Sequence, residues 1–279
     1  MPSVLPKCDV VLLVKTACLS VLHYYVCNKE YIYSAEGTVH NTKKLKKTSP
    51  AIKKELFIIR QKADEIRDRW VKDEENWRTL PARAWPETQP SVEEIPNLQK
   101  SYERLCSGNH GNSVSTEACK DTTFFLATAL LFNSVDVEKG LELFESLADG
   151  GDVRGQTAAG ICYVEGLGVD SDEEKGSKLL QHAANSGFLQ ATYEMGALYY
   201  NGNALPFVKE DVQMAFRLFE LTAAQNHTSG LYMTADMLLS GEGCEEKDVP
   251  RAIRLLYLAG ERGHRNARAT LWALLREYE

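Results

Sequence analysis

QATYEMGALYYNG at residues 190–202, followed by DVQMAFRLFELTAA at residues 211–224, is the stretch of sequence that decides the fold. Each segment carries apolar residues at spacings of three and four, which predicts two amphipathic helices. Gly202 stands where the first helix should end, because the residue after the last helical turn favours a positive φ that glycine adopts without strain. The stretch therefore predicts a pair of helices joined by a loop.

The same pattern recurs along the C-terminal half of the chain. A copy at residues 157–187 stands 36 positions earlier, so that Gly160 corresponds to Gly196. A degenerate third copy includes residues 235–263, and a weaker copy at residues 124–151 precedes all of them. One helix pair cannot bury its own apolar face, so successive copies are expected to stack on one another.

These copies predict an all-α fold, in which residues 121–279 form a right-handed α-solenoid of about four helix-turn-helix repeats. The last half-repeat, residues 267–278, is expected to cap the stack. Small residues such as Gly160 should let paired helices approach closely, and Gly187 should close a second helix. His227 takes the place of that glycine in the next copy, so we expect backbone strain or a different helix end there.

The two strong copies resemble the Sel1-like repeat, a relative of the tetratricopeptide repeat with the pattern A-x-x-x-L-G-x-x-Y-x-x-G…K-A-x-x-(W/F/Y)-x-x-A-A-x-x-G. The matching residues are Ala191, Met195, Gly196, Tyr199, Gly202, Ala215, Phe219, Ala223 and Ala224 in one copy, and Gly160, Tyr163, Gly166, Gly168, Lys175, Ala183, Ala184 and Gly187 in the copy before it. The resemblance covers about residues 123–279. It implies an adaptor in a multiprotein assembly, in the endoplasmic reticulum, in mitochondria or in signalling, without naming a partner.

The part of the chain before the repeats divides into three segments. Residues 1–50 are a basic and apolar leader. Residues 51–80 carry an apolar stripe at helical spacing and predict an amphipathic helix. Four prolines lie within residues 81–96. Residues 81–120 are therefore expected to form an extended strap, a short helix and a flexible loop.

The most apolar stretch of the leader, residues 10–27, has the length of a short membrane span, but Lys15 lies inside it. A charge in the middle of a span is costly in lipid. Three interpretations stay open: a signal or signal-anchor segment, an organelle-targeting leader, or a packed N-terminus. Membrane contact by residues 10–27 is one of these alternatives and not a conclusion.

Charge and cysteine spacing limit the class of partner and the compartment. The net charge is −7, of which residues 1–54 carry about +6 and the rest about −13. An acidic solenoid does not suit a nucleic-acid backbone, so no nucleic acid is expected to bind it. The seven cysteines are irregularly spaced and include no C-x-x-C pair, which favours reduced thiols. We therefore expect a mitochondrial or cytosolic protein, with the endoplasmic reticulum as an alternative.

Motifs of catalysis are missing from the sequence. It contains no H-E-x-x-H, P-loop or G-x-S-x-G pattern. The Gly166-x-Gly168 and Gly241-x-Gly243 segments resemble fragments of a phosphate loop, but each is expected to end a helix. Cys106, His110 and Cys119 lack the spacing of a zinc site. We therefore predict no catalytic, cofactor-binding or metal-binding residue, and we do not expect an enzyme.

The surface of the solenoid is then the expected functional site. Side chains from the first helix of each pair normally line the concave face, where aromatic residues near acids suit a basic and apolar peptide or helix. An apolar inserted loop offers a second contact surface. For Tyr193 and Tyr232, packing against the neighbouring repeat is an alternative that the sequence supports at least as well as partner binding. The predicted partner-binding residues are Tyr193, Glu194, Tyr200, Tyr232, Asp236 and Leu239 of the helices, and Pro206 and Phe207 of the loop.

The leading interpretation is a protein-binding adaptor or scaffold that holds a peptide or helix in the solenoid groove. One alternative is a structural subunit of a large mitochondrial or other organellar complex. A second alternative is an enzyme with a cleft between the N-terminal region and the solenoid. That enzyme would need titratable residues that converge in one pocket.

Overall fold

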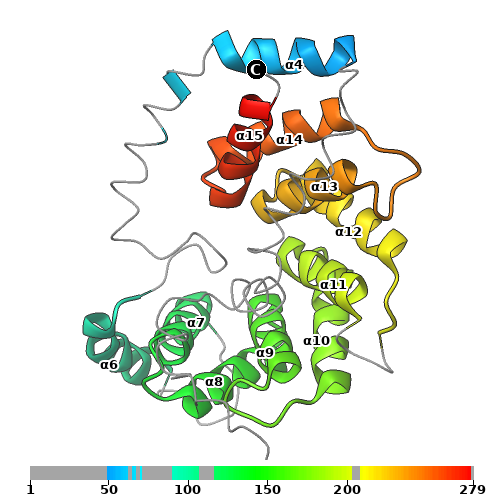
Figure 1. Ribbon diagram of the computed structural model, residues 1–279. Helices are drawn as coiled ribbons and strands as arrows, with labels where there is room; N and C mark the ends of the chain where they lie inside the picture. Colours follow the sequence, from blue (N-terminus) through cyan, green and yellow to red (C-terminus); the bar gives the residue numbers. More distant parts are fainter. Residues whose placement is uncertain are drawn as a thin grey trace, which may run out of the picture. The chain divides into compact units, whose positions relative to one another are not determined.

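The computed structural model describes residues 49–61, 65, 66, 70, 90–106, 116–202 and 208–277. Helices make up the regular structure of these ranges (Figure 1). The leader, Trp85 of the strap, and Pro206 and Phe207 of the inserted loop lie outside them. The chain divides into two compact units, one with residues 90–183 and one with residues 49–70 and 184–279 of the described part.

The first unit contains two helices that precede the repeats and the earliest helices of the repeats themselves. Its elements are η2 (Val92–Glu94), α6 (Ile95–Cys106), α7 (Glu117–Phe132), α8 (Val137–Asp149), α9 (Val153–Glu165) and most of α10 (Glu173–Asn185). Helix α6 packs on α7, α7 on α8, and α8 on α9. Phe124 and Phe144 meet in the core with ring centroids 5.7 Å apart. The short helix expected before residue 106 and the weak first copy are therefore both confirmed.

The second unit contains the remaining repeats and a helix from far upstream. Its elements are α4 (Pro50–Gln61), α11 (Leu189–Asn201), α12 (Val212–Ala224), α13 (Thr228–Ser240), α14 (Val249–Glu261) and α15 (Arg265–Glu277). Successive helices from α11 to α15 pack on one another, and α4 packs on α14. The structure therefore confirms the predicted all-α repeat fold and the terminal half-repeat. None of the helices in the described ranges is both long and apolar enough for a membrane span.

The apolar stripe predicted from residue 51 onward is buried against the last helices of the second unit. Trp70 lies edge-on to Trp272 with ring centroids 5.9 Å apart, and its Nε1–H donates to Glu261 at 2.9 Å. The Arg268 guanidinium lies 4.8 Å from the Trp70 ring centroid. A Cβ at Gly260 would come within 2.7 Å of that ring, so glycine is required there. Buried residues of the stripe are Ile52, Leu56, Ile59, Ile66 and Trp70.

Small residues let the two helices of a repeat approach closely, as predicted. A Cβ on Gly160 of α9 would lie 2.9 Å from Leu180 of α10. A Cβ on Gly196 of α11 would lie 2.8 Å from the Phe219 ring of α12. These distances are shorter than any ordinary carbon–carbon contact, so larger residues would push the helices apart.

Second helices begin at an aspartate in each repeat, a regularity that sequence analysis missed. The carboxylate accepts the backbone N–H three residues later, which satisfies one of the free donors at a helix start. These N-caps are Asp136, Asp172, Asp211 and Asp248, with N–H to carboxylate distances of 3.0, 2.9, 2.9 and 2.9 Å. Their spacing follows the repeat and could have fixed the register of every copy from sequence alone.

Of the two alternatives expected at His227, backbone strain is wrong and a different helix end is what the structure shows. Its φ is −65°, and its imidazole caps α13 by accepting the Gly230 N–H at Nδ1, at 3.2 Å. The left-handed residue stands one position earlier, at Asn226, with φ of 60°. Asn226 therefore corresponds to Gly187, whose φ is 84°. Asparagine tolerates this conformation better than most residues, so the helix pair closes without glycine.

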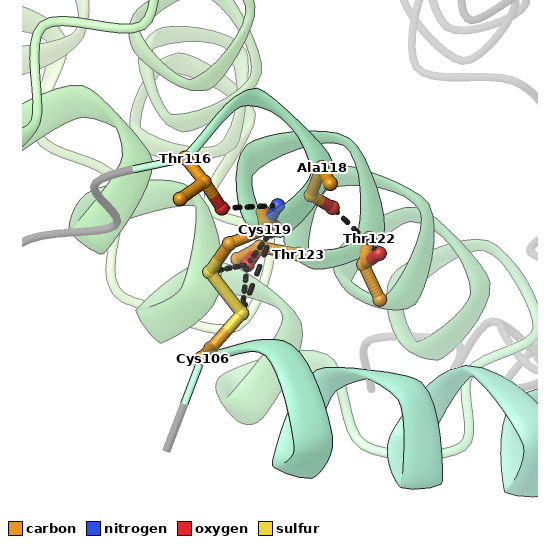
Figure 2. Close-up of a disulfide and its surroundings, with 6 residues drawn as sticks. All are labelled: Cys106, Thr116, Ala118, Cys119, Thr122 and Thr123. Atoms are coloured by element: carbon orange, nitrogen blue, oxygen red, sulfur yellow. Dashed lines mark hydrogen bonds between the residues drawn. A yellow bond between two sulfur atoms is a disulfide. The ribbon is translucent and has the colours of Figure 1, made fainter. Parts of the chain in front are cut away.

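Cys106 at the end of α6 forms a disulfide with Cys119 in the first turn of α7 (Figure 2). The expectation of reduced cysteines is therefore wrong for this pair, whereas Cys162 and Cys244 are free. Burial raises the pKa of the Cys162 thiol to about 12 and keeps it protonated. A separation of 13 positions matches no disulfide motif, so only the packing of α6 on α7 reveals the bond.

Gly187→Ala is expected to lower the free energy of unfolding by about 1 kcal/mol, because alanine is strained at positive φ. A Cβ at Gly187 would meet no atom within 4 Å, so the loss of stability would come from the backbone conformation and not from a steric clash. Gly150→Ala is the matched control, since Gly150 has φ of −75° and should accept alanine within about 0.5 kcal/mol. Urea denaturation of both variants measures the difference. Equal stability of the two would contradict the assignment of Gly187.

Replacing Cys106 and Cys119 together by serine should lower the stability of the first unit by up to about 3 kcal/mol. Without the bond the unfolded chain gains conformational entropy, because it no longer contains a closed loop. Cys244→Ser is the control and should change stability by less than about 0.5 kcal/mol. Guanidinium denaturation under non-reducing conditions measures both. Alkylation of Cys106 and Cys119 in the native, unreduced protein would show that the bond does not form.

Candidate partner-binding surface

The predicted binding residues on α11 and α13 separate into buried and open groups. Tyr193, Glu194 and Tyr232 are 8%, 4% and 7% exposed. The Tyr193 ring lies 5.4 Å from Phe219 and 5.3 Å from His227, measured between centroids. These three predicted residues lie in the interior of the repeats. For Tyr193, the alternative of packing against the next repeat is confirmed.

Tyr232 repeats this arrangement one repeat later. Its ring stacks on His264, with centroids 4.4 Å apart. His264 caps α15 by accepting the Ala267 N–H at Nδ1, at 3.2 Å. The large aromatic side chains of α11 and α13 thus pack against the residue that caps the first helix of the next repeat. For Tyr232 too, the alternative of packing against the neighbouring repeat is what the structure shows.

A buried hydrogen-bond chain joins the starts of α11 and α13. The His227 Nε2 lies 3.0 Å from the Gln190 side-chain oxygen, and the Gln190 amide donates to Glu194 at 2.5 Å. Because Nδ1 of His227 accepts the Gly230 N–H, the proton belongs on Nε2, which donates to Gln190. Burial lowers the pKa of His227 to about 4, so the imidazole is neutral at physiological pH. This chain is a structural network.

Three of the predicted binding residues lie in the C-terminal parts of the same helices and are partly exposed. Tyr200, Asp236 and Leu239 are neither buried nor fully exposed. The Tyr200 hydroxyl donates to the Glu242 carboxylate at 2.8 Å. Burial, and to a smaller extent the charge of Glu242, raise the pKa of Asp236 to about 6. The open surface therefore carries two neighbouring acids, an aromatic residue and a leucine.

Glu242 was missed by the sequence analysis, although a signal existed. It stands between Gly241 and Gly243, directly after the predicted end of a first helix. Both glycines have positive φ, at 83° and 68°, and a Cβ at Gly243 would collide with the Val212 carbonyl oxygen of α12. The turn is therefore packed against α12 at Gly243, and Glu242 between the two glycines is exposed.

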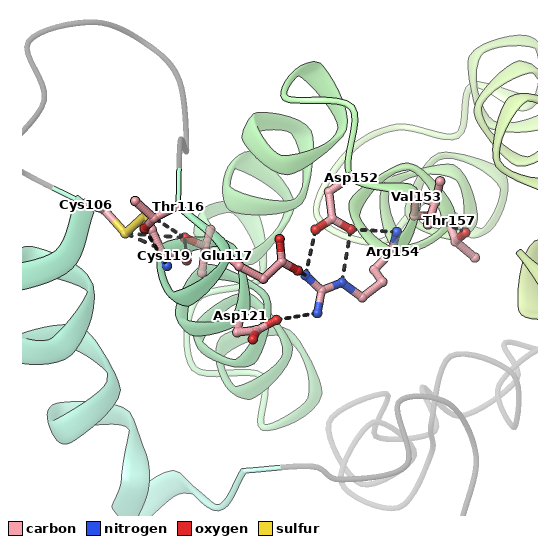
Figure 3. Close-up of polar contacts among 10 residues, drawn as sticks. Cys106, Thr116, Glu117, Cys119, Asp121, Asp152, Val153, Arg154 and Thr157 are labelled. Atoms are coloured by element: carbon pink, nitrogen blue, oxygen red, sulfur yellow. Dashed lines mark hydrogen bonds and ion pairs between the residues drawn. A yellow bond between two sulfur atoms is a disulfide. The ribbon is translucent and has the colours of Figure 1, made fainter. Parts of the chain in front are cut away.

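Arg154 at the start of α9 is the centre of a separate cluster in the first unit (Figure 3). Its guanidinium contacts Asp152 at 2.7 Å and Asp121 at 2.5 Å, and lies 5.3 Å from the Phe124 ring centroid. These carboxylates raise the pKa of Arg154 above its ordinary value. Asp121 of α7 and Asp152 at the start of α9 balance the charge of Arg154. The cluster therefore holds α9 against α7, and the Arg154 cation is already paired.

A second cluster in the first unit is also internally balanced. The Lys175 ammonium contacts Glu145 at 2.9 Å and lies 3.9 Å from the Tyr163 ring centroid. Burial alone would raise the pKa of Glu145, but the hydrogen bonds from Lys175 and Tyr163 lower it overall. Within the described ranges, no group of three or more histidine, cysteine or acidic side chains is placed to hold a metal ion.

Comparison with known proteins agrees with this geometry. The Sel1 repeat family model matches residues 131–152, 153–188, 189–227 and 228–264. The last three matches begin at the first residues of α9, α11 and α13. Sel1 repeats generally serve as protein-interaction scaffolds. Among curated protein sequences, none matches this chain.

Two solved structures are similar to this chain. A Sel1 repeat protein from Oxalobacter formigenes is 24% identical, with a TM-score of 0.52 over 64% of this chain and 73% of that one. A protective antigen of uropathogenic Escherichia coli with an SLR fold is also 24% identical, with a TM-score of 0.49 over 62% of this chain and 34% of that one. The first likeness supports the repeat fold.

Asp236→Asn is expected to raise the free energy of unfolding by about 1–2 kcal/mol at pH 8, because it removes a charge that the fold desolvates. The pKa of Asp236 is raised, so its penalty is fully present above pH 6 and is relieved as the pH falls toward 4. The gain should therefore shrink between pH 8 and pH 4. Thermal and urea unfolding at both pH values measure it.

Glu246→Gln is the matched control, because Glu246 is an exposed acid in the same unit. Its stability should stay within about 0.5 kcal/mol of the wild type at both pH values. A loss of stability in Asp236→Asn at pH 8 would show that the carboxylate makes a stabilising contact.

Proposed function

We propose that this chain, a Sel1 repeat protein over residues 131–264, works as a scaffold that binds a polypeptide along the first helices of its repeats. The observation that carries the proposal is the contrast between its polar groups. Arg154, Lys175 and His227 are committed to structural contacts. Tyr200 and Leu239 at the ends of α11 and α13, and Asp236 four residues before the end of α13, are partly exposed.

Apolar and aromatic groups at this surface support binding of a peptide or helix. Tyr200 and Leu239 occupy the same position in successive first helices, one residue before the last. Aromatic and leucine side chains at a partly enclosed position are typical anchors for a partner's apolar residue. Pro206 and Phe207 of the inserted loop stay in the proposal as further contacts, although they lie outside the described residues.

The disulfide favours an oxidising compartment for this scaffold. Disulfides persist in the endoplasmic reticulum and outside the cell, and are rare where thiols are kept reduced. The Cys106–Cys119 bond therefore supports the endoplasmic reticulum or a secreted location over the cytosol. A role as a fixed subunit of an organellar complex, and membrane contact by residues 10–27, remain as alternatives within the same proposal. The enzyme alternative gains no support from the clusters around Arg154 and Lys175.

The test is selection of displayed random 12-residue peptides against the full chain. The wild type should enrich a set of peptides, and a Tyr200→Ala, Leu239→Ala variant should bind them at least tenfold more weakly, because both anchors are lost. Anisotropy of labelled peptides measures the dissociation constants.

Leu221→Ala is the matched control, because Leu221 is an exposed leucine on α12, a second helix. It should bind the same peptides as tightly as the wild type does. Failure to enrich any peptide, or equal weakening by the control, would reject the proposed surface.

A further inference from the structure

Asp236 occupies a position that the repeat fills with uncharged residues elsewhere. The position lies four residues before the end of each first helix, and its occupants are Thr128, Ile161, Ala197, Asp236 and Ala273. Ile161 and Ala197 are 4% and 6% exposed. The repeat architecture therefore has no need of a carboxylate there, and Asp236 is the one charged residue in this set.

No group in the described part of the chain compensates the charge of Asp236. Its carboxylate makes no hydrogen bond and no ion pair there. The Lys247 stem packs over Gly241, yet its ammonium forms no ion pair with Asp236 or Glu242. An acid that is desolvated and repelled by a second acid lowers the stability of the fold, and residues of this kind concentrate at binding sites.

Glu242 departs from the repeat in the same way. The corresponding turn after α9 runs Gly166-Leu167-Gly168, with positive φ at both glycines, so leucine stands where Glu242 stands. The Tyr200 hydroxyl of α11 holds the Glu242 carboxylate by a hydrogen bond. Two exceptions to the repeat thus occur together, one recessed on α13 and one exposed in the turn that follows it.

We propose that Asp236 and Glu242 form an anionic subsite that receives one lysine or arginine side chain of the bound polypeptide. The stem of such a side chain would lie along Tyr200 and Leu239, while its cation meets the two carboxylates. Charge-assisted hydrogen bonds to carboxylates are among the strongest that a surface can offer, and the Asp236 carboxylate is partly shielded from water. This subsite rests on the scaffold function proposed above and adds the chemistry of the ligand.

A divalent cation suits the site less well than a basic side chain. Calcium takes six to eight oxygen ligands, and magnesium prefers octahedral geometry. The pair supplies two carboxylates, and the described residues contain no third acidic, histidine or cysteine ligand in a metal-binding group. A lysine or arginine needs only the two acids and an apolar surface for its stem, and the Tyr200 ring lies beside Glu242.

The test repeats the random-peptide selection with three full-length proteins: the wild type, Asp236→Asn, and Glu242→Lys. Peptides from the wild type should share one enriched lysine or arginine. Asp236→Asn should bind them at least tenfold more weakly, although its melting temperature should be equal or higher. Glu242→Lys should no longer select the basic residue. Replacing that residue of the peptide by alanine should weaken wild-type binding by a similar factor and leave Asp236→Asn little changed, as expected of a direct pair.

Other outcomes separate this inference from the scaffold proposal. Enriched peptides that bind through Tyr200 and Leu239 but share no basic residue would overturn the subsite and leave the scaffold standing. Absence of any enriched peptide would overturn both. A rise in melting temperature with calcium or magnesium chloride, seen in the wild type and lost in Asp236→Asn, would make the pair a cation site and overturn the inference.

Discussion

Close packing around the first helix of each repeat is the constraint on which the rest of the structure depends. In α11, every residue from Gln190 to Leu198 is buried, and in α9 the same holds from Gly155 to Tyr163. A helix that is buried on all sides can approach its neighbours only through small residues, which is the role of Gly196. Larger side chains must point into gaps between helices, so they serve packing before they can serve a partner.

This constraint also decides which residues a partner can reach. Tyr193 and Tyr232 lie in the middle of their helices, where rings hold the next helix start through His227 and His264. Tyr200 and Leu239, one residue before the ends of α11 and α13, and Glu242 in the glycine turn after α13 are partly or fully exposed. A binding surface in such a protein is therefore expected at helix ends, and its residues can change without disturbing the stack.

Periodicity in the sequence predicted the helix pairs, because packing imposes the same small residues at the same spacing in each copy. It could not show which of the α11 aromatic residues are covered, since one helix has several apolar faces and the spacing does not identify the neighbour on each. The sequence pattern placed His227 at the glycine position of the repeat, whereas the structure places Asn226 there. Asparagine and glycine can both take a left-handed conformation, so the search for a glycine missed this position by one residue. The Cys106–Cys119 bond depends on a contact between two elements, which no repeat pattern encodes.

Repeat arrays also explain how the second unit tolerates an unfavourable carboxylate. Stability in such arrays comes from each repeat and from its interfaces with direct neighbours, so contacts in the same or adjacent repeats can offset a destabilising residue. Asp236 lies on α13, which packs on α14, and α14 is covered in turn by α4. Trp70, fixed by Glu261 and Trp272, adds a large buried ring at that same end. This upstream segment therefore stabilises α14, the direct neighbour of the helix that carries Asp236.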